Sequence, residues 1–98
     1  MIKYGIRIKG NSGGIMGELS KLPNIGSVVE EQLNKVGIKT CEQLRQAGSK
    51  QAWLMIKSFD DSACIHRLYA LEGAIQGVKK TELSDEIRKE LKEFYQSH

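Results

Sequence analysis

The segment Leu22-Pro23-Asn24-Ile25-Gly26 decides the fold that we predict for this 98-residue chain. Proline lacks the amide hydrogen that a helix interior needs, so a short helical turn before it ends at Pro23. Glycine adopts positive φ without strain, and asparagine tolerates it better than most residues, so Asn24 and Gly26 favour a tight turn. Ile25 is the apolar residue at the centre of this turn. The pattern predicts two short helices joined by a hairpin.

The residues around the turn follow the same design. Ser27 and Glu30 have the spacing of a capping box, which predicts that a helix begins directly after the turn. Residues 18–36 resemble the helix-hairpin-helix motif, usually written hydrophobe-Pro-Gly-Ile-Gly, whose exposed amides hold a DNA phosphate. The residues that the resemblance places at the phosphate site are Asn24, Ile25, Gly26, Ser27 and Val28, with Lys21, Lys35 and Lys39 as neighbouring cations.

Apolar spacing and capping signals predict an all-α chain, with about five helices around one core after the short first turn. The predicted starts each follow a capping or acidic residue, and two stops fall on glycine. The helices begin after Ser27, Thr40, Ser49, Asp60 and Ser84, and the first two end at Gly37 and Gly48. The residues expected in the core are Leu22, Ile25, Val29, Leu33, Ile38, Leu44, Trp53, Ile56, Leu68, Leu71, Ile75, Ile87 and Leu91.

Residues 1–17 are predicted to form an arm and a glycine-rich linker before the helical domain of residues 18–98. Apolar and polar residues alternate over residues 2–8, as in a half-buried β-strand. Four alternatives stay open for this strand. It could pair with its copy in another chain and form a homodimer, lie on the helices, remain disordered, or precede a domain that begins at Met16.

The charge balance does not indicate a basic body. The chain has 15 Lys and Arg against 12 Asp and Glu, for a net charge of +3. Three basic residues and no acid lie in residues 1–9, which leaves 12 basic and 12 acidic side chains in residues 10–98. Net charge alone therefore gives little support to nucleic-acid binding. Lys79 and Lys80 follow a helix end, where cations suit the negative end of the helix dipole.

No arrangement of residues indicates catalysis, a metal or a cofactor. Ser/His/Asp, Cys/His and phosphate-loop patterns are missing, so we expect no enzyme. Cys41 and Cys64 have no second ligand at metal spacing and are expected to be reduced thiols. No apolar run approaches the ~20 residues of a membrane span, and no signal peptide is visible, so we expect a cytoplasmic protein with no membrane partner.

Four separated segments resemble the C-terminal domain of the TfoX family in order and spacing. They are Leu22-Pro-Asn-Ile-Gly26, Val36-Gly-Ile-Lys-Thr40, Leu44-Arg-Gln-Ala-Gly48 and Leu68-Tyr-Ala-Leu-Glu-Gly-Ala-Ile-Gln-Gly77. The resemblance covers residues 18–96 and implies a role in regulating natural competence and DNA transformation in bacteria. Family members normally carry a further N-terminal domain, and we expect this chain to be a standalone copy without it.

Two functions from different classes remain open. In the first, the chain is a DNA-associated regulatory module that binds phosphates through the amides of residues 25–28 and recognises little of the DNA base sequence. In the second, it is a protein-protein interaction module that keeps the fold without binding DNA. The second is favoured by the absence of a basic residue directly after Gly26, where Glu30 and Glu31 follow instead. The two differ in salt dependence, because phosphate contacts release counterions.

Overall fold

The computed structural model describes residues 18–98. The arm predicted over residues 1–17, with its strand and the homodimer built on it, lies outside the described residues. The elements in chain order are η1 (Leu19–Lys21), α1 (Ser27–Lys35), α2 (Cys41–Lys57), α3 (Ile65–Gln76), η2 (Lys80–Glu82) and α4 (Asp85–Gln96). No strand occurs within residues 18–98, so the all-α prediction is confirmed for this part of the chain.

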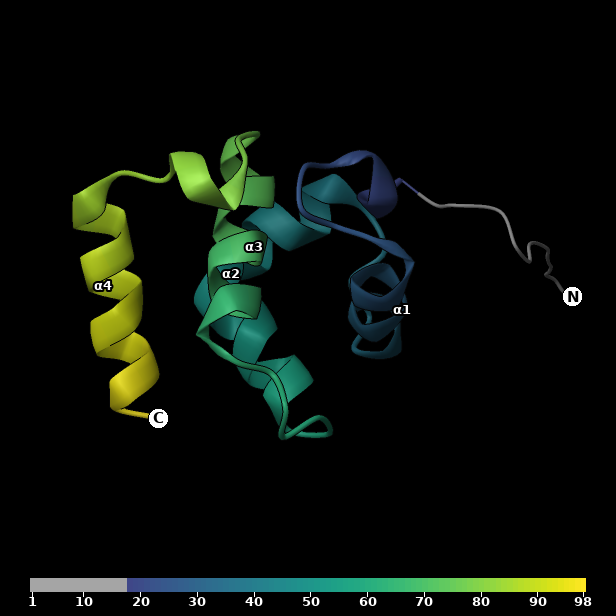
Figure 1. Cartoon of the computed structure of the whole chain (residues 1–98). Helices are drawn as coiled ribbons and strands as arrows, with labels where there is room; N and C mark the ends of the chain where they lie inside the picture. The colour runs from purple at the N-terminus through teal and green to yellow at the C-terminus, as the bar shows by residue number, and fades with distance from the viewer. Residues whose placement is uncertain (1–17) are drawn as a thin grey trace, which may run out of the picture.

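Helices α2 and α3 form the centre of the molecule. They pack side by side more extensively than any other pair of elements, and α1 and α4 lie on opposite sides of them (Figure 1). The buried ring of Trp53 in α2 fixes α4, because Phe94 and Tyr95 meet it edge-on at centroid distances of 6.0 and 5.5 Å. The indole N–H of Trp53 donates to the Cys64 carbonyl at 3.2 Å, so this buried polar group is satisfied.

Helix α2 consists of two helical segments that meet at Gly48. This residue has φ 83° and ψ 159°, which is not helical. A residue with a side chain would be strained at this positive φ, so glycine is the residue that permits the break. The predicted stop at Gly48 and a new helical segment after it are thereby confirmed. The predicted cap at Ser49 is wrong, because its hydroxyl donates to the Glu72 carboxylate at 2.6 Å. The five predicted helices correspond to α1, the two segments of α2, α3 and α4.

At the starts of α1, α2 and α4, two predicted helix caps are confirmed and one is wrong. The Thr40 hydroxyl accepts from the Gln43 amide at 3.1 Å, and the Gln43 side chain accepts from the Thr40 amide at 3.2 Å. Ser84 caps α4 in the predicted way. The capping box at Ser27 is wrong, because Ser27 is already the first residue of α1. Its expected partner Glu30 is buried and accepts from the Ser20 amide of η1 at 3.3 Å instead.

The core follows the predicted apolar pattern closely. Of the thirteen residues expected there, nine are buried and the other four, Leu22, Val29, Ile75 and Ile87, are partly buried against the cluster. The predicted core omitted five buried residues of the cluster, which are small or lie outside the long helices. These are Leu19, Ala52, Ala63, Ala74 and Leu83.

The turn of residues 22–26 is locked to the far end of α3 by the side chain of Asn24. Its Nδ2 donates to the carbonyls of Ala70 and Val78 at 3.3 and 3.0 Å. Its Oδ1 accepts from the Lys80 amide at 3.0 Å. These three hydrogen bonds, here called the Asn24 clamp, use both ends of the amide group. Asn24 also has φ 70°, the left-handed conformation predicted for this position.

Gly73 makes the clamp possible by letting the turn approach α3 closely. A Cβ at this position would lie 2.5 Å from Nδ2 of Asn24 and 2.7 Å from the Val78 carbonyl oxygen. Real Cβ atoms essentially never come this close to another heavy atom, so a side chain here would displace the turn or the backbone. Gly73 is therefore required by the close packing of the turn and the following backbone against α3.

We predict that Asn24→Asp lowers the free energy of unfolding by about 2–4 kcal/mol, because two partly buried carbonyls would lose their donor and face a carboxylate. Aspartate keeps the shape of asparagine and also tolerates positive φ, so the change isolates the hydrogen bonds. Urea unfolding followed by circular dichroism measures the loss. Asn34→Asp, the same change at an exposed position of α1, should alter stability by less than about 0.5 kcal/mol. Equal losses in the two variants would show that the clamp contributes nothing.

Candidate nucleic-acid interface

The start of α1 presents backbone donors on the surface of the turn. The first amides of a helix have no acceptor within it, and the first to bond back is that of Glu30, to the Gly26 carbonyl at 3.0 Å. Gly26, Ser27 and Val28 are all exposed, and a Cβ on Gly26 would have no neighbour within 4 Å. Their backbone N–H groups, here called the amide surface, lie at the positive end of the helix dipole. The space beside Gly26 is open to an anion, and the exposed carboxylate of Glu31 lies further along α1.

Two of the residues predicted for the phosphate site point into the protein and stabilise the fold. The Ile25 side chain is only 6% exposed, and its amide donates to the Leu22 carbonyl at 3.4 Å. The Asn24 side chain is fully engaged in the clamp. The outward-facing donors therefore begin at Gly26, while Asn24 and Ile25 hold the turn from behind.

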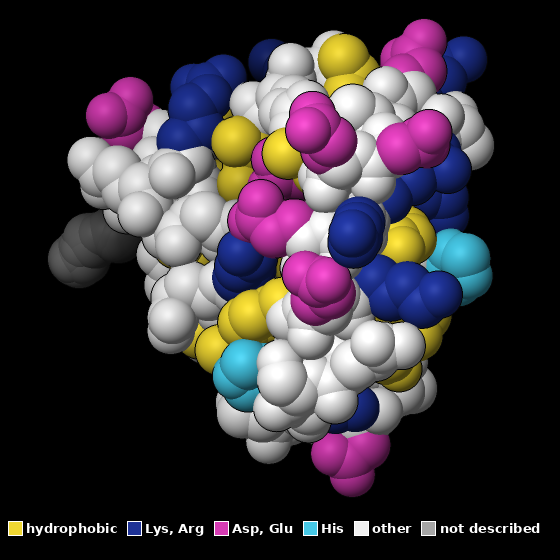
Figure 2. Space-filling model, turned by 90° about the vertical axis from the view of Figure 1, so that its left-hand side faces the viewer, with side chains coloured by type: hydrophobic (Ala, Val, Ile, Leu, Met, Phe, Trp, Pro, Cys, Tyr) yellow, Lys and Arg dark blue, Asp and Glu magenta, His cyan; other side chains and the backbone are white. Residues whose placement is uncertain are grey.

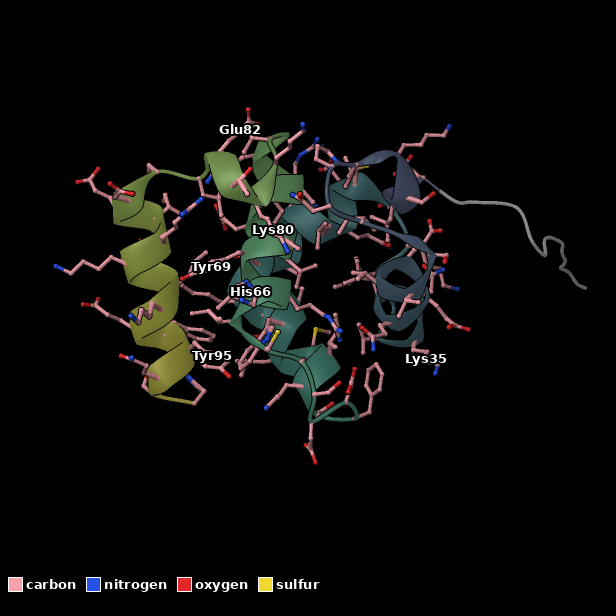
Figure 3. All side chains as sticks on the ribbon, viewed as in Figure 1. Lys35, His66, Tyr69, Lys80, Glu82 and Tyr95 are labelled. Atoms are coloured by element: carbon pink, nitrogen blue, oxygen red, sulfur yellow. The ribbon has the colours of Figure 1, made fainter. Side chains whose placement is uncertain are left out.

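The three lysines predicted to assist the site do not share one surface. Lys21 is the last residue of η1 and is exposed directly before the turn. Lys35 is the last of the nine residues of α1. A nine-residue helix is about 13 Å long, so Lys35 is separated from the amide surface by that length. Figure 3 shows Lys35 at the end of α1 that lies away from η1.

Lys35 and Lys39 border a different feature, an open hollow on α1. Its other lining residues are Glu30, Glu31 and Asn34, so carboxylates and ammonium groups face the same space. The Lys35 ammonium also lies 5.7 Å from the ring centroid of Phe59, which is 46% exposed. This mixed surface does not extend the positive field of the amide surface.

A basic pair that the sequence assigned to a helix dipole lies next to the turn. The Asn24 clamp places the backbone of Val78 and Lys80 within hydrogen-bonding distance of the turn, although Lys80 lies 56 positions after Asn24. Lys79 and Lys80 are both exposed. Two residues signalled that the turn packs against another element: Asn24, in place of the glycine usual in the motif, and Gly73. Neither residue shows from the sequence alone that the other element is the segment Val78–Lys80.

A polar network fixes the other side of α1 to the loop between α2 and α3. The Asp60 carboxylate accepts from Arg67 at 2.9 Å and from Gln32 at 2.7 Å, and Arg67 also donates to Gln32 at 2.9 Å. Hydrogen bonds from Ser62, Arg67 and Gln32 hold the pKa of the Asp60 carboxyl well below its ordinary value of 3.8. The helix start predicted at Asp60 is therefore wrong, because this carboxylate makes tertiary bonds and α3 begins later, at Ile65.

Other chemical sites find no support in the described part of the chain. Within residues 18–98 no group of three His, Cys, Asp or Glu side chains is placed to hold a metal ion. Cys41 and Cys64 are both free thiols, and burial together with the Glu18 carboxylate raises the pKa of Cys41. Over the same residues, no helix has the length and apolar character to cross a membrane.

Comparisons with known proteins give consistent matches. The family model of the TfoX C-terminal domain matches residues 15–95. Protein Sxy of Escherichia coli (strain K12) is 37% identical over 79 residues, which are 81% of this chain but only 38% of that protein. The chain thus spans well under half of this relative.

Two solved structures from Listeria monocytogenes share the fold. The triclinic form of an uncharacterized protein superposes with a TM-score of 0.81 at 51% identity, covering 83% of this chain and 92% of that one. The tetragonal form of a protein of unknown function gives a TM-score of 0.79 at 51% identity, covering 82% and 98%. At this identity the agreement supports the arrangement of α1 to α4 as a property of the sequence family.

We predict that Asp60→Asn lowers the thermal midpoint at neutral pH and reduces the acid sensitivity of the fold. The pKa of Asp60 is depressed in the folded state, so its stabilising contribution is present above the unfolded value near 3.8 and is lost as the pH falls through the folded value. Thermal melts at about pH 7, 5, 4 and 3 should show the two curves converging towards acid. Asp61→Asn, at an exposed carboxylate outside this network, is the control, and a constant difference at every pH would contradict the assignment.

Proposed function

The chain belongs to the TfoX C-terminal domain family, and from this premise we propose that it is a non-enzymatic regulatory module that acts in competence and DNA transformation. Its proposed activity is weak, sequence-independent binding of DNA phosphates. In this proposal η1, the turn of residues 22–26 and α1 act together as the helix-hairpin-helix motif. The chain spans 38% of the length of Sxy, so the proposal includes no activity of the remaining part of that protein.

The amide surface is the observation that carries this proposal. Its donors are backbone groups, which contact phosphates but carry no information on base sequence. They lie on an exposed helix N-terminus, and the turn before it is held rigidly by the Asn24 clamp. A preorganised donor set loses little conformational entropy when the anion binds. Lys21 supplies a nearby positive charge, whereas Lys35 and Lys39 could reach only a longer stretch of the same duplex.

A second function is favoured by a separate observation. Val28 is 62% exposed and Phe59 is 46% exposed, and these are the large apolar side chains that stand out on the surface of residues 18–98. Val28 lies on the amide surface itself, where a phosphate gains nothing from an apolar neighbour. A protein-protein interaction module that keeps the fold without binding DNA would use these two side chains as contacts.

We predict that the full chain binds an arbitrary DNA duplex with a dissociation constant of about 10⁻⁴–10⁻⁶ M, and that binding weakens strongly between about 50 and 200 mM salt. Fluorescence anisotropy with a labelled duplex measures both. Gly26→Val should fold normally, because Gly26 has extended φ and ψ of −98° and −174° and open space around its Cβ. Its side chain would cover the amides, and we expect about a tenfold loss of affinity.

Gln51→Val is the matched control, because it places the same side chain on an exposed position of α2. Equal binding by Gly26→Val and Gln51→Val would remove the amide surface from the account. No binding by the unaltered chain up to about 100 μM at either salt concentration would reject the DNA proposal as a whole. Val28→Ser and Phe59→Ser would then be the variants with which to test a protein partner.

A further inference from the structure

We propose that Lys79 and Lys80 form the second half of the DNA-binding surface, so that the amide surface and this lysine pair contact neighbouring phosphates of one strand. The inference rests on the proposed function and extends it to two residues that the hairpin motif does not contain. It starts from the Asn24 clamp, which joins the turn to the backbone of Val78 and Lys80.

The distances suit successive phosphates on a DNA strand. The Lys80 amide is 3.0 Å from the Asn24 side chain, and two residues separate Asn24 from Ser27. Three residue steps span at most about 10 Å, and the Asn24 side chain with its 3.0 Å bond to the Lys80 amide adds to this, so the amide surface and the start of η2 lie at most about 16 Å apart. Each strand of B-DNA carries one charge per about 3.4 Å of helix axis, so at most about five or six consecutive phosphates cover this span. In Figure 3 the Lys80 side chain extends from η2 along α3.

The charge of this pair is available for an external anion. Both lysines are exposed, and among residues 18–98 the ion pairs within 4.0 Å are Lys50–Glu90 and Arg67–Asp60. The acid close by in sequence is Glu82, whose Oε1 accepts from the Lys79 amide at 3.0 Å and so caps η2. The start of α1 has no cation of its own, because Ser27 and Val28 are uncharged and Glu30 and Glu31 follow them, so the positive charge must come from another part of the chain.

A purely local role for the pair makes a different prediction. Cations beyond the last turn of α3 could simply interact with the negative end of its dipole, which is worth about 0.3–1 kcal/mol of stability. In that case, neutralising the lysines would change unfolding and leave the salt dependence of DNA binding unaltered. Binding and stability, measured on the same variants, therefore separate the two roles.

The test uses the full chain with Lys79→Gln and Lys80→Gln combined, beside the control Lys89→Gln and Lys92→Gln. Both double variants remove two exposed positive charges, and the control pair belongs to α4, on the opposite side of α2 and α3 from the turn (Figure 1). Figure 2 shows that the face carrying α4 mixes basic and acidic side chains, so no field of one sign is altered there. The backbone bond from the Lys80 amide to Asn24 stays in place in either variant.

Each phosphate contact contributes about 0.9 to the slope of log affinity against log salt, so we expect the Lys79/Lys80 variant to lose about 1.8 from that slope. Its affinity at low salt should fall about three- to tenfold, while the Lys89/Lys92 variant keeps the slope of the unaltered chain. Equal slopes in the two variants, with Gly26→Val still impaired, would overturn this inference and leave the proposed function standing. Failure of the unaltered chain to bind DNA would overturn both.

Discussion

The side chain of Asn24 links two parts of the sequence that are 46 to 56 residues apart. Its amide nitrogen bonds to Ala70 and Val78, and its amide oxygen bonds to the Lys80 amide. No other proteinogenic side chain combines this short donor-acceptor group with tolerance of the left-handed φ of 70° at this position. Gly73 is the complementary requirement, because any Cβ there would occupy the space of the Asn24 amide nitrogen.

The position of α1 depends on this contact and on the Asp60 network at its other end. The clamp holds the turn before α1 against the end of α3, and the bonds of Gln32 with Asp60 and Arg67 hold α1 to the loop between α2 and α3. Between these two attachments the buried face of α1 contributes Leu33 to the core. The amides at Gly26–Val28 therefore follow a turn that is held on both sides, and the same clamp ties the backbone of Val78 and Lys80 to Asn24.

Most of the fold could be predicted from the sequence because its signals are local. Apolar spacing identified the core, and Thr40, Gly48 and Ser84 marked helix boundaries in their own immediate surroundings. Prediction failed where a polar side chain has a distant partner: Glu30 bonds to η1 and Asp60 bonds to α1 instead of capping helices. For the site, the motif identified the exposed amides but could not show that Asn24 faces inwards, that Lys35 is at the far end of α1, or that η2 lies beside the turn.

Amide chemical-shift mapping of the ¹⁵N-labelled full chain, titrated with a short unlabelled duplex, tests the central claim most directly. That claim is that a turn locked by Asn24 presents one continuous phosphate-binding surface built from the start of α1 and the start of η2. We predict that the resonances of Gly26, Ser27, Val28, Lys79 and Lys80 shift together along one binding curve, while those of α4 stay in place. Shifts that are confined to α4 or to the neighbourhood of Phe59, or no shifts at duplex concentrations well above about 100 μM, would contradict it.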